Sequence, residues 1–192
     1  MQVRVALLAV ACLLPVAQAA PIVYFAELSG PSESPPVASP GTGWALVTID
    51  TVAHILSVDT SFSGLMGTVT VAHIHCCTAT PFTGTVGVAT ALPTFPGFPS
   101  GVTSGTYSNT FDTTLLSTFG AAFVTANGGT AAGAEAALAA GLASGRAYLN
   151  IHTNLYPGGE IRGFLAPVPE PGTLALVGAA LAVLALRVRR RL

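Results

Sequence analysis

Short runs of alternating apolar and polar residues, most of them bounded by glycine or proline, constrain the fold of this chain most strongly. Such alternation is typical of β-strands that bury one face. The boundaries favour turns, because proline has no N–H to give to a sheet and glycine tolerates left-handed backbone. Runs of this kind occupy residues 22–28, 43–50, 54–62, 69–75, 85–92, 105–111, 146–153 and 160–165.

One stretch departs from this alternation and indicates a helix. Residues 130–143 are dense in alanine, Thr130 is placed to cap the first turn, and Leu138 and Leu142 lie one turn apart. We therefore expect an all-β protein with seven or eight antiparallel strands and one short helix. Short connections between strands favour an immunoglobulin-like β-sandwich or a flattened barrel.

Charge is distributed unevenly along the chain. Five of the seven basic residues lie in the two terminal segments, and the chain contains no lysine. Between residues 21 and 168, two arginines stand against seven carboxylates, which gives a formal charge of −5. We expect no nucleic-acid partner, because phosphate binding needs clustered basic side chains.

The first 19 residues have the layout of a secretory signal peptide. Arg4 provides the positive start, residues 5–14 are apolar, and Ala17 and Ala19 form a small-residue cleavage site. We expect cleavage after Ala19 and export of the rest of the chain.

Two histidines alternate within one predicted strand, and a third lies in a later strand. His73 and His75 should point to the same face, because successive side chains of a strand point to opposite faces. If the strand that carries His152 lies beside them, three imidazoles could converge and bind copper or zinc. The alternative is a structural role, in which the imidazoles hydrogen-bond backbone groups or the side chains of Glu160 and Tyr148.

Cys76 and Cys77 directly follow these histidines. Export places both cysteines in an oxidising compartment, where thiols rarely stay free, so we expect a vicinal disulfide. Intermolecular pairing and thiolate ligation of a metal held by the histidines are the alternatives.

Glu160 and Arg162 lie two residues apart in the last predicted strand. We expect them to share a face and to pair with each other, or with polar groups around Asn150 and His152, in a structural role. The sequence shows no paired general acid and base, no Ser-His-Asp order, no phosphate-binding glycine loop and no calcium loop. We therefore predict no catalytic residues, and a protein that is not an enzyme.

Several motifs occur together in a fixed order. They are FAELSG at 25–30, Glu33, PPV at 35–37, Gly41, Gly43, AHIH at 72–75, YLNIHT at 148–153 and PGGEIRG at 157–163. This order resembles the CHRD domain, a module first noticed in the developmental protein chordin and common in bacterial surface proteins. The resemblance covers residues 22–165, and it places Glu160 and Arg162 in a recurring motif to which no catalytic role is attached.

The C-terminal segment, residues 168–192, has three parts. Pro169, Glu170 and Pro171 are followed by an uncharged apolar run over 172–186 and by a tail with four arginines. This layout resembles the PEP-CTERM sorting signal of Gram-negative bacteria, a Pro-Glu-Pro motif before a transmembrane helix and a basic tail. The resemblance implies recognition by an exosortase, a membrane-embedded processing enzyme. A permanent tail anchor is the alternative, and in either case the arginines should remain cytoplasmic.

Together these features predict a signal peptide (1–19), a CHRD domain (22–165) and a sorting segment (168–192). We expect inner-membrane anchoring through residues 172–186 before processing, and then a position at the cell surface or outside a Gram-negative cell. The sorting signal implies a binding or structural module of a biofilm matrix, with exopolysaccharide or other matrix proteins as partners. The alternative is a copper or zinc protein with weak redox or hydrolytic activity.

Overall fold

Alternating residues of the chain form strands in which one face is buried. The computed structural model describes residues 20–169. The strands are β1 (Ile22–Ser29), β2 (Thr42–Asp50), β3 (Ile55–Ser63), β4 (Val69–Cys76), β5 (Gly105–Asp112), β6 (Ala147–Thr153), β7 (Ile161–Phe164) and β8 (Ala166–Pro167). The helices are α1 (Ala121–Ala126) and α2 (Ala131–Ala143), with short 3-10 turns η1 (Gly30–Ser32) and η2 (Leu116–Thr118).

Three predicted features lie outside the described residues. They are the signal peptide, Glu170 and Pro171 of the sorting motif, and the apolar run over 172–186. Within residues 20–169, no helix is both long and apolar enough to cross a membrane.

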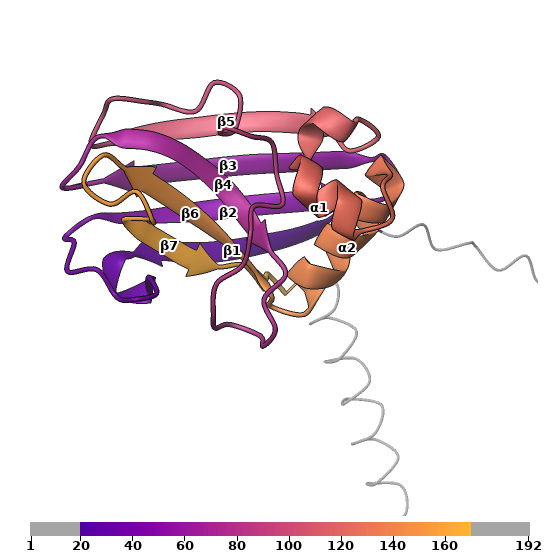
Figure 1. Ribbon diagram of the computed structural model, residues 1–192, viewed down its shortest axis with the longest axis horizontal. Helices are drawn as coiled ribbons and strands as arrows, with labels where there is room; N and C mark the ends of the chain where they lie inside the picture. Colours follow the sequence, from indigo (N-terminus) through magenta and orange to yellow (C-terminus); the bar gives the residue numbers. More distant parts are fainter. Residues whose placement is uncertain (1–19, 170–192) are drawn as a thin grey trace, which may run out of the picture.

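All strands belong to one antiparallel sheet in the order β4-β6-β7-β1-β2-β3-β5, and β8 pairs with β1. The sheet curls into a half-barrel, so that β4, β6 and β7 lie across β1, β2, β3 and β5 (Figure 1). The prediction of a mostly β, antiparallel protein is confirmed. The two separate sheets of an immunoglobulin-like sandwich are not formed, because Ser29 of β1 pairs with Arg162 of β7 and joins the two halves.

The core fills the concave side of this sheet. Ala45, Val47 and Ile49 of β2 and Leu56 and Val58 of β3 are buried at alternate positions, while the residues between them face outward. Burial of a large apolar side chain contributes about 1.5–3 kcal/mol, so this alternation is the main local reason for the sheet.

Strands β4 and β6 are covered on both faces. Every residue of β6 is buried, as are the last five of β4. Their inner face carries Ala72, Ile74, Leu149 and Ile151 into the core, and segments 77–100 and 154–159 cover their outer face. The outer face of these two strands is therefore buried although it is polar.

The prediction of a strand over residues 85–92 is wrong. The segment makes only isolated bridges, from Val88 to His75 and from Thr90 to Phe119. It follows the free edge of β4 irregularly, through backbone hydrogen bonds such as Ala89 N–H to Ile74 O at 2.9 Å. The Val86 carbonyl is turned towards His75, and the Ala89 carbonyl accepts from Gly120 N–H, so no regular ladder forms with β4.

The helices lie together at one end of the sheet (Figure 1). The predicted helix is present as α2, where the Thr130 hydroxyl accepts a hydrogen bond from Gly133 N–H at 3.1 Å. Leu138 and Leu142 of α2 are fully buried. Helix α1 was not predicted, because a six-residue helix that buries only Phe123 and Val124 carries no recognisable periodicity.

We expect Leu138→Ala to lower the free energy of unfolding by about 2–5 kcal/mol, because it leaves a cavity between α2 and the sheet. Leu116→Ala is the matched control, since Leu116 is 56% exposed, and it should change stability by about 0.5 kcal/mol or less. Urea unfolding followed by circular dichroism measures both. Equal losses in the two variants would show that α2 does not close the core.

Candidate metal centre

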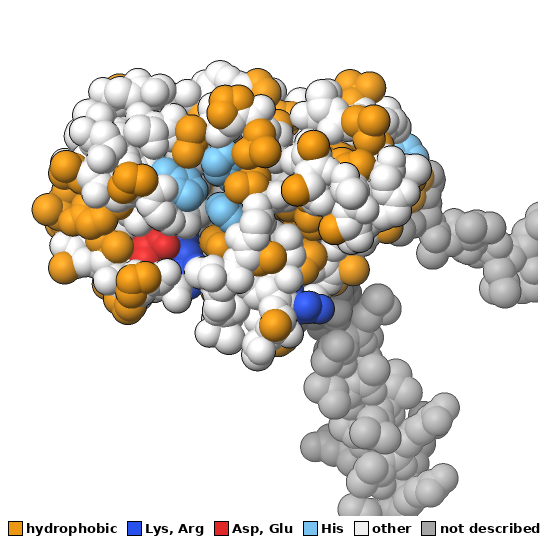
Figure 2. Space-filling view, viewed as in Figure 1, with side chains coloured by type: hydrophobic (Ala, Val, Ile, Leu, Met, Phe, Trp, Pro, Cys, Tyr) orange, Lys and Arg blue, Asp and Glu red, His pale blue; other side chains and the backbone are white. Residues whose placement is uncertain are grey.

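The structure brings together the three histidines that the sequence analysis singled out. In the β4–β6 register, His73 lies opposite Asn150 and His75 opposite Tyr148, while His152 lies opposite Val71. Their ring centroids are 5.5–5.8 Å apart, and one possible ligand atom from each lies within 4.8 Å of the others. Histidine side chains gather over β4 and β6, next to one acidic and one basic side chain (Figure 2).

Each imidazole is held by a backbone carbonyl from a covering segment. His73 Nε2 lies 2.6 Å from Pro93 O, His75 Nδ1 2.8 Å from Val86 O, and His152 Nδ1 2.9 Å from Pro157 O. A carbonyl oxygen only accepts hydrogen bonds, so each of these ring nitrogens carries the hydrogen. The hydrogen bonds therefore select the tautomer and the orientation of all three rings.

Burial keeps these imidazoles neutral. It lowers the pKa of His75 to about 4, against the opposing effect of the Val86 carbonyl, and the nearby His152, His73 and Arg162 lower it further. Burial is also the largest cause of the lowered pKa of His73 and of His152. At neutral pH the second nitrogen of each ring is therefore an unprotonated lone pair.

These three lone pairs have no partner. His73 Nδ1, His75 Nε2 and His152 Nε2 are buried and lack any hydrogen bond. An unpartnered buried acceptor costs about 1–3 kcal/mol, and most buried polar atoms are paired. Three such atoms in one cluster form a candidate ligand-binding site.

This donor set fits a metal ion. Neutral imidazole nitrogens suit zinc and copper, and ligating histidines ordinarily donate their other N–H to a carbonyl or carboxylate. Metal–nitrogen distances of about 2.0–2.1 Å would place the nitrogens roughly 3.3–3.6 Å apart. The possible ligand atoms lie within 4.8 Å of one another, so the rings would move closer together to reach these distances.

Tyr148 and Arg162 border the histidine cluster. The ring of Tyr148 stacks on His75 with centroids 4.8 Å apart and an interplanar angle of 3°. The guanidinium of Arg162 lies 4.8 Å from the centroid of the Tyr148 ring. The ordered stack limits rotation of the His75 ring.

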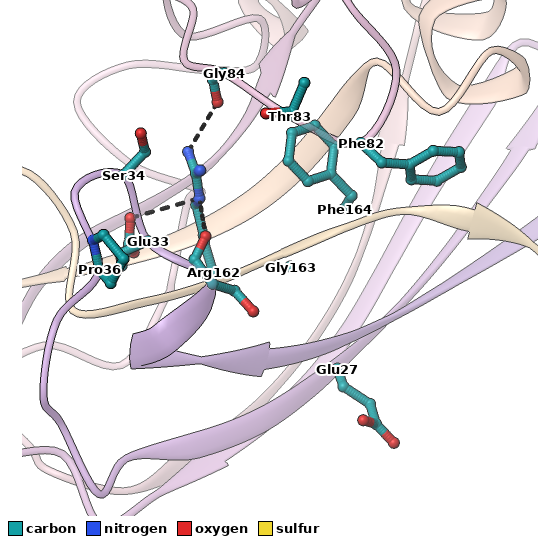
Figure 3. A pocket seen from close by; sticks show the side chains of 11 residues that line it. Glu27, Glu33, Ser34, Pro36, Phe82, Thr83, Gly84, Arg162, Gly163 and Phe164 are labelled. Atoms are coloured by element: carbon teal, nitrogen blue, oxygen red, sulfur yellow. Dashed lines mark hydrogen bonds and ion pairs between the residues drawn. The ribbon is translucent and has the colours of Figure 1, made fainter.

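Arg162 pairs with Glu33. Of the two arrangements expected for Glu160 and Arg162, pairing with each other is not formed. The guanidinium donates to Ser32 O at 2.5 Å and to Gly84 O at 3.1 Å, and its Nε lies 3.7 Å from Glu33 Oε2 (Figure 3). Through Gly84, Arg162 also holds the segment that presents the Val86 carbonyl to His75. Sequence reasoning gave Glu33 no such role, because Glu33 and Arg162 are far apart along the chain.

Glu160 points to a different set of partners, because it precedes β7 and the alternation does not extend to it. It accepts hydrogen bonds from Ser39 Oγ, Met66 N, Gly67 N and Thr153 Oγ1 at 2.5–3.0 Å. Burial alone would raise the pKa of Glu160, but these hydrogen bonds hold it below its ordinary value. Glu160 therefore ties three segments together beside the end of β6.

The sulfur atoms of Cys76 and Cys77 are bonded to each other. Cys76 belongs to the core, on the face opposite His75, and both sulfurs lie against Gly141 of α2, where there is no room for a Cβ. In this arrangement neither cysteine offers a thiolate to the histidine cluster.

Glu33 should make stability depend on pH. Burial raises its pKa to about 7, although Arg162, Ser34 and Asn150 oppose the shift. The folded state then binds the proton more tightly than the unfolded state, so the stabilising contribution of Glu33 falls as pH rises from about 4.5 to 7.

Relative to Glu33→Gln, the natural protein should therefore lose stability across this pH range. Urea unfolding at a series of pH values measures the difference between the two proteins. The variant also loses the carboxylate beside Arg162, which changes its stability by a constant amount at every pH. Only the difference between the slopes of the two stability–pH curves therefore reports the titration of Glu33. Parallel stability curves would contradict the raised pKa.

Two family models match the chain. The CHRD domain model matches residues 24–165, and the PEP-CTERM protein-sorting motif matches residues 167–191. No curated protein and no solved structure matches. The sorting motif indicates an exported cell-surface protein that an exosortase processes. The half-barrel described above accounts for nearly the whole of the CHRD match, and the chain belongs to the CHRD domain family.

Proposed function

We propose that this exported protein binds one copper or zinc ion through His73, His75 and His152. The observation that carries the proposal is the set of three buried ring nitrogens that lack partners and belong to one compact cluster. Histidines with a purely structural role are expected to use both nitrogens in hydrogen bonds when they are buried. Here one nitrogen of each ring donates a hydrogen bond to a backbone carbonyl, and the other nitrogen has no hydrogen-bond partner.

The covering segments support metal binding in a second way. Pro93, Val86 and Pro157 lie on separate stretches of chain, yet each directs a carbonyl oxygen at a histidine of this cluster. These carbonyls hold each ring in the tautomer that leaves its second nitrogen free to bind a metal. The entropy lost in ordering the three rings is therefore lost when the protein folds, and not when a metal binds. When bound, the metal would supply a positive charge that the neutral rings do not balance.

We propose a binding role rather than catalysis. The three histidines are only 4–8% exposed, which restricts the approach of a substrate to the metal. The rival function, weak redox or hydrolytic chemistry, needs an open coordination position that a substrate reaches. Turnover of a redox dye or an activated ester by the metal-loaded protein, absent in His75→Ala, would favour that rival.

The place of action follows from the sorting signal. We propose that the protein is anchored in the inner membrane of a Gram-negative bacterium before processing and then acts at the cell surface or in a biofilm matrix. Exopolysaccharide or other matrix proteins would be its partners there. The negative charge of the exported domain is compatible with a neutral or cationic partner.

Elemental analysis of the purified protein after dialysis against copper or zinc tests the metal centre. We expect one metal per chain, with loss of most of it in His73→Ala, His75→Ala and His152→Ala. His54→Ala is the matched control, because His54 pairs with Glu135 outside the cluster, and it should retain the metal. Equal metal content in all four variants would contradict the proposal.

Proton competition gives an independent measurement. Metal binding displaces protons from histidine only below the histidine pKa, and burial lowers the pKa of all three ligands. We expect the zinc dissociation constant of the protein to stay level from pH 8 to about 6.5 and to rise only in more acidic solution. A rise that begins near pH 7, as for exposed histidines, would show that the site is open to solvent.

A further inference from the structure

A groove follows the outward side of β1. None of the three histidines lines it, and Arg162 at one end also borders the histidine cluster. The groove consists of two adjoining hollows of about 430 and 500 Å³ that share Glu27 and Ser32 in their walls. Phe25 and Trp44 line the first hollow, and Phe82, Phe164 and Arg162 are among the residues that line the second (Figure 3). We call the two hollows together the β1 groove.

Aromatic side chains form one wall of the β1 groove. Trp44, the only tryptophan of the chain, is 42% exposed, and Phe25 is 39% exposed. Trp44 lies opposite Glu27 in the β1–β2 register, and Phe25 lies two residues from Glu27, so all three share the outward face. A contiguous exposed apolar patch rimmed by polar residues is a mark of an interaction site.

Polar groups lie beside these rings, and the hydroxyls of Ser29 and Ser32 are hydrogen-bonded to each other at 2.8 Å. Ser29, Ser32 and Thr42 line the first hollow. Among the described residues, the carboxylate of Glu27 makes no hydrogen bond or ion pair. Arg162 donates its hydrogen bonds to backbone carbonyls and lies beside Glu33, while Glu27 brings a negative charge to both hollows, which disfavours an anionic polymer.

The shape and the chemistry of the groove point to one class of ligand. The backbone of β1 is already paired with β2 on one side and with β7 and β8 on the other, so the groove cannot accept an added strand. The negative electron density of an aromatic face attracts the C–H groups of a sugar ring. Hydroxyl and carboxylate groups beside the ring then hydrogen-bond the sugar hydroxyls.

We infer that the β1 groove binds a neutral oligosaccharide, with sugar rings stacked on Trp44 and Phe25 and sugar hydroxyls bonded to Glu27 and Ser32. The inference deepens the proposed matrix partnership by giving it a site and a ligand class. It does not depend on the metal centre.

Trp44 provides a direct reporter, because any change in tryptophan fluorescence comes from the groove itself. The full protein is titrated to millimolar concentration with cellohexaose, laminarihexaose and mannohexaose, and with a galacturonic acid hexamer as the anionic comparator. We expect a saturable fluorescence change with at least one neutral sugar and a weaker one, or none, with the anionic sugar.

Calorimetry with the best sugar then tests the residues. Trp44→Ala and Glu27→Gln should weaken affinity about tenfold or more, and Trp44→Phe should retain part of it. Leu116→Ala removes a comparably exposed apolar side chain outside the groove and should change nothing.

Three results would overturn the inference. They are no saturable binding of any neutral sugar, binding that Trp44→Ala leaves intact, and tighter binding of the anionic sugar. Self-association in the ultracentrifuge that Trp44→Ala abolishes, without sugar binding, would assign the groove to a second copy of the chain. His75→Ala separates the two sites, because it should lose metal and keep sugar affinity.

Discussion

Burial of both faces of β4 and β6 is the constraint on which the candidate site depends. A strand that is covered on both faces ordinarily carries apolar residues on both, because buried polar groups must find partners. These two strands carry histidine, asparagine and tyrosine on their outer face. The covering segments must therefore supply hydrogen bonds, and they give up regular structure to do so.

The irregularity of segment 77–100 has this cause. It contributes Val86 O to His75 and Pro93 O to His73, while Thr90 Oγ1 accepts from Ile74 N–H at 3.0 Å. A regular strand would direct these carbonyls along the sheet instead of down onto the imidazoles. The histidines and the segments that cover them thus depend on each other for their hydrogen bonds. Each histidine keeps one ring nitrogen without a hydrogen-bond partner.

Two buried carboxylates hold the segments around this unit. Glu33 lies beside Arg162 and Asn150, whereas Glu160 collects hydrogen bonds from the chain around Met66 and from Thr153. The pKa values of the two differ in direction, since burial dominates at Glu33 and hydrogen bonds dominate at Glu160. Removal of either carboxylate would leave donors without partners in a region of low dielectric constant.

Local sequence pattern alone determined most of the strands and helix α2 with its Thr130 cap. It also determined the shared face of His73 and His75 and the sorting motif that begins at Pro169. Alternation, capping and short motifs each depend on only a few neighbouring residues, so the sequence is enough to predict them. Tertiary structure alone decided the rest. The bridge from Ser29 to Arg162, the pairing of Glu33 with Arg162 and the arrival of His152 beside His73 all join positions far apart in the chain. Their free energy comes from packing between distant segments, which no local pattern records.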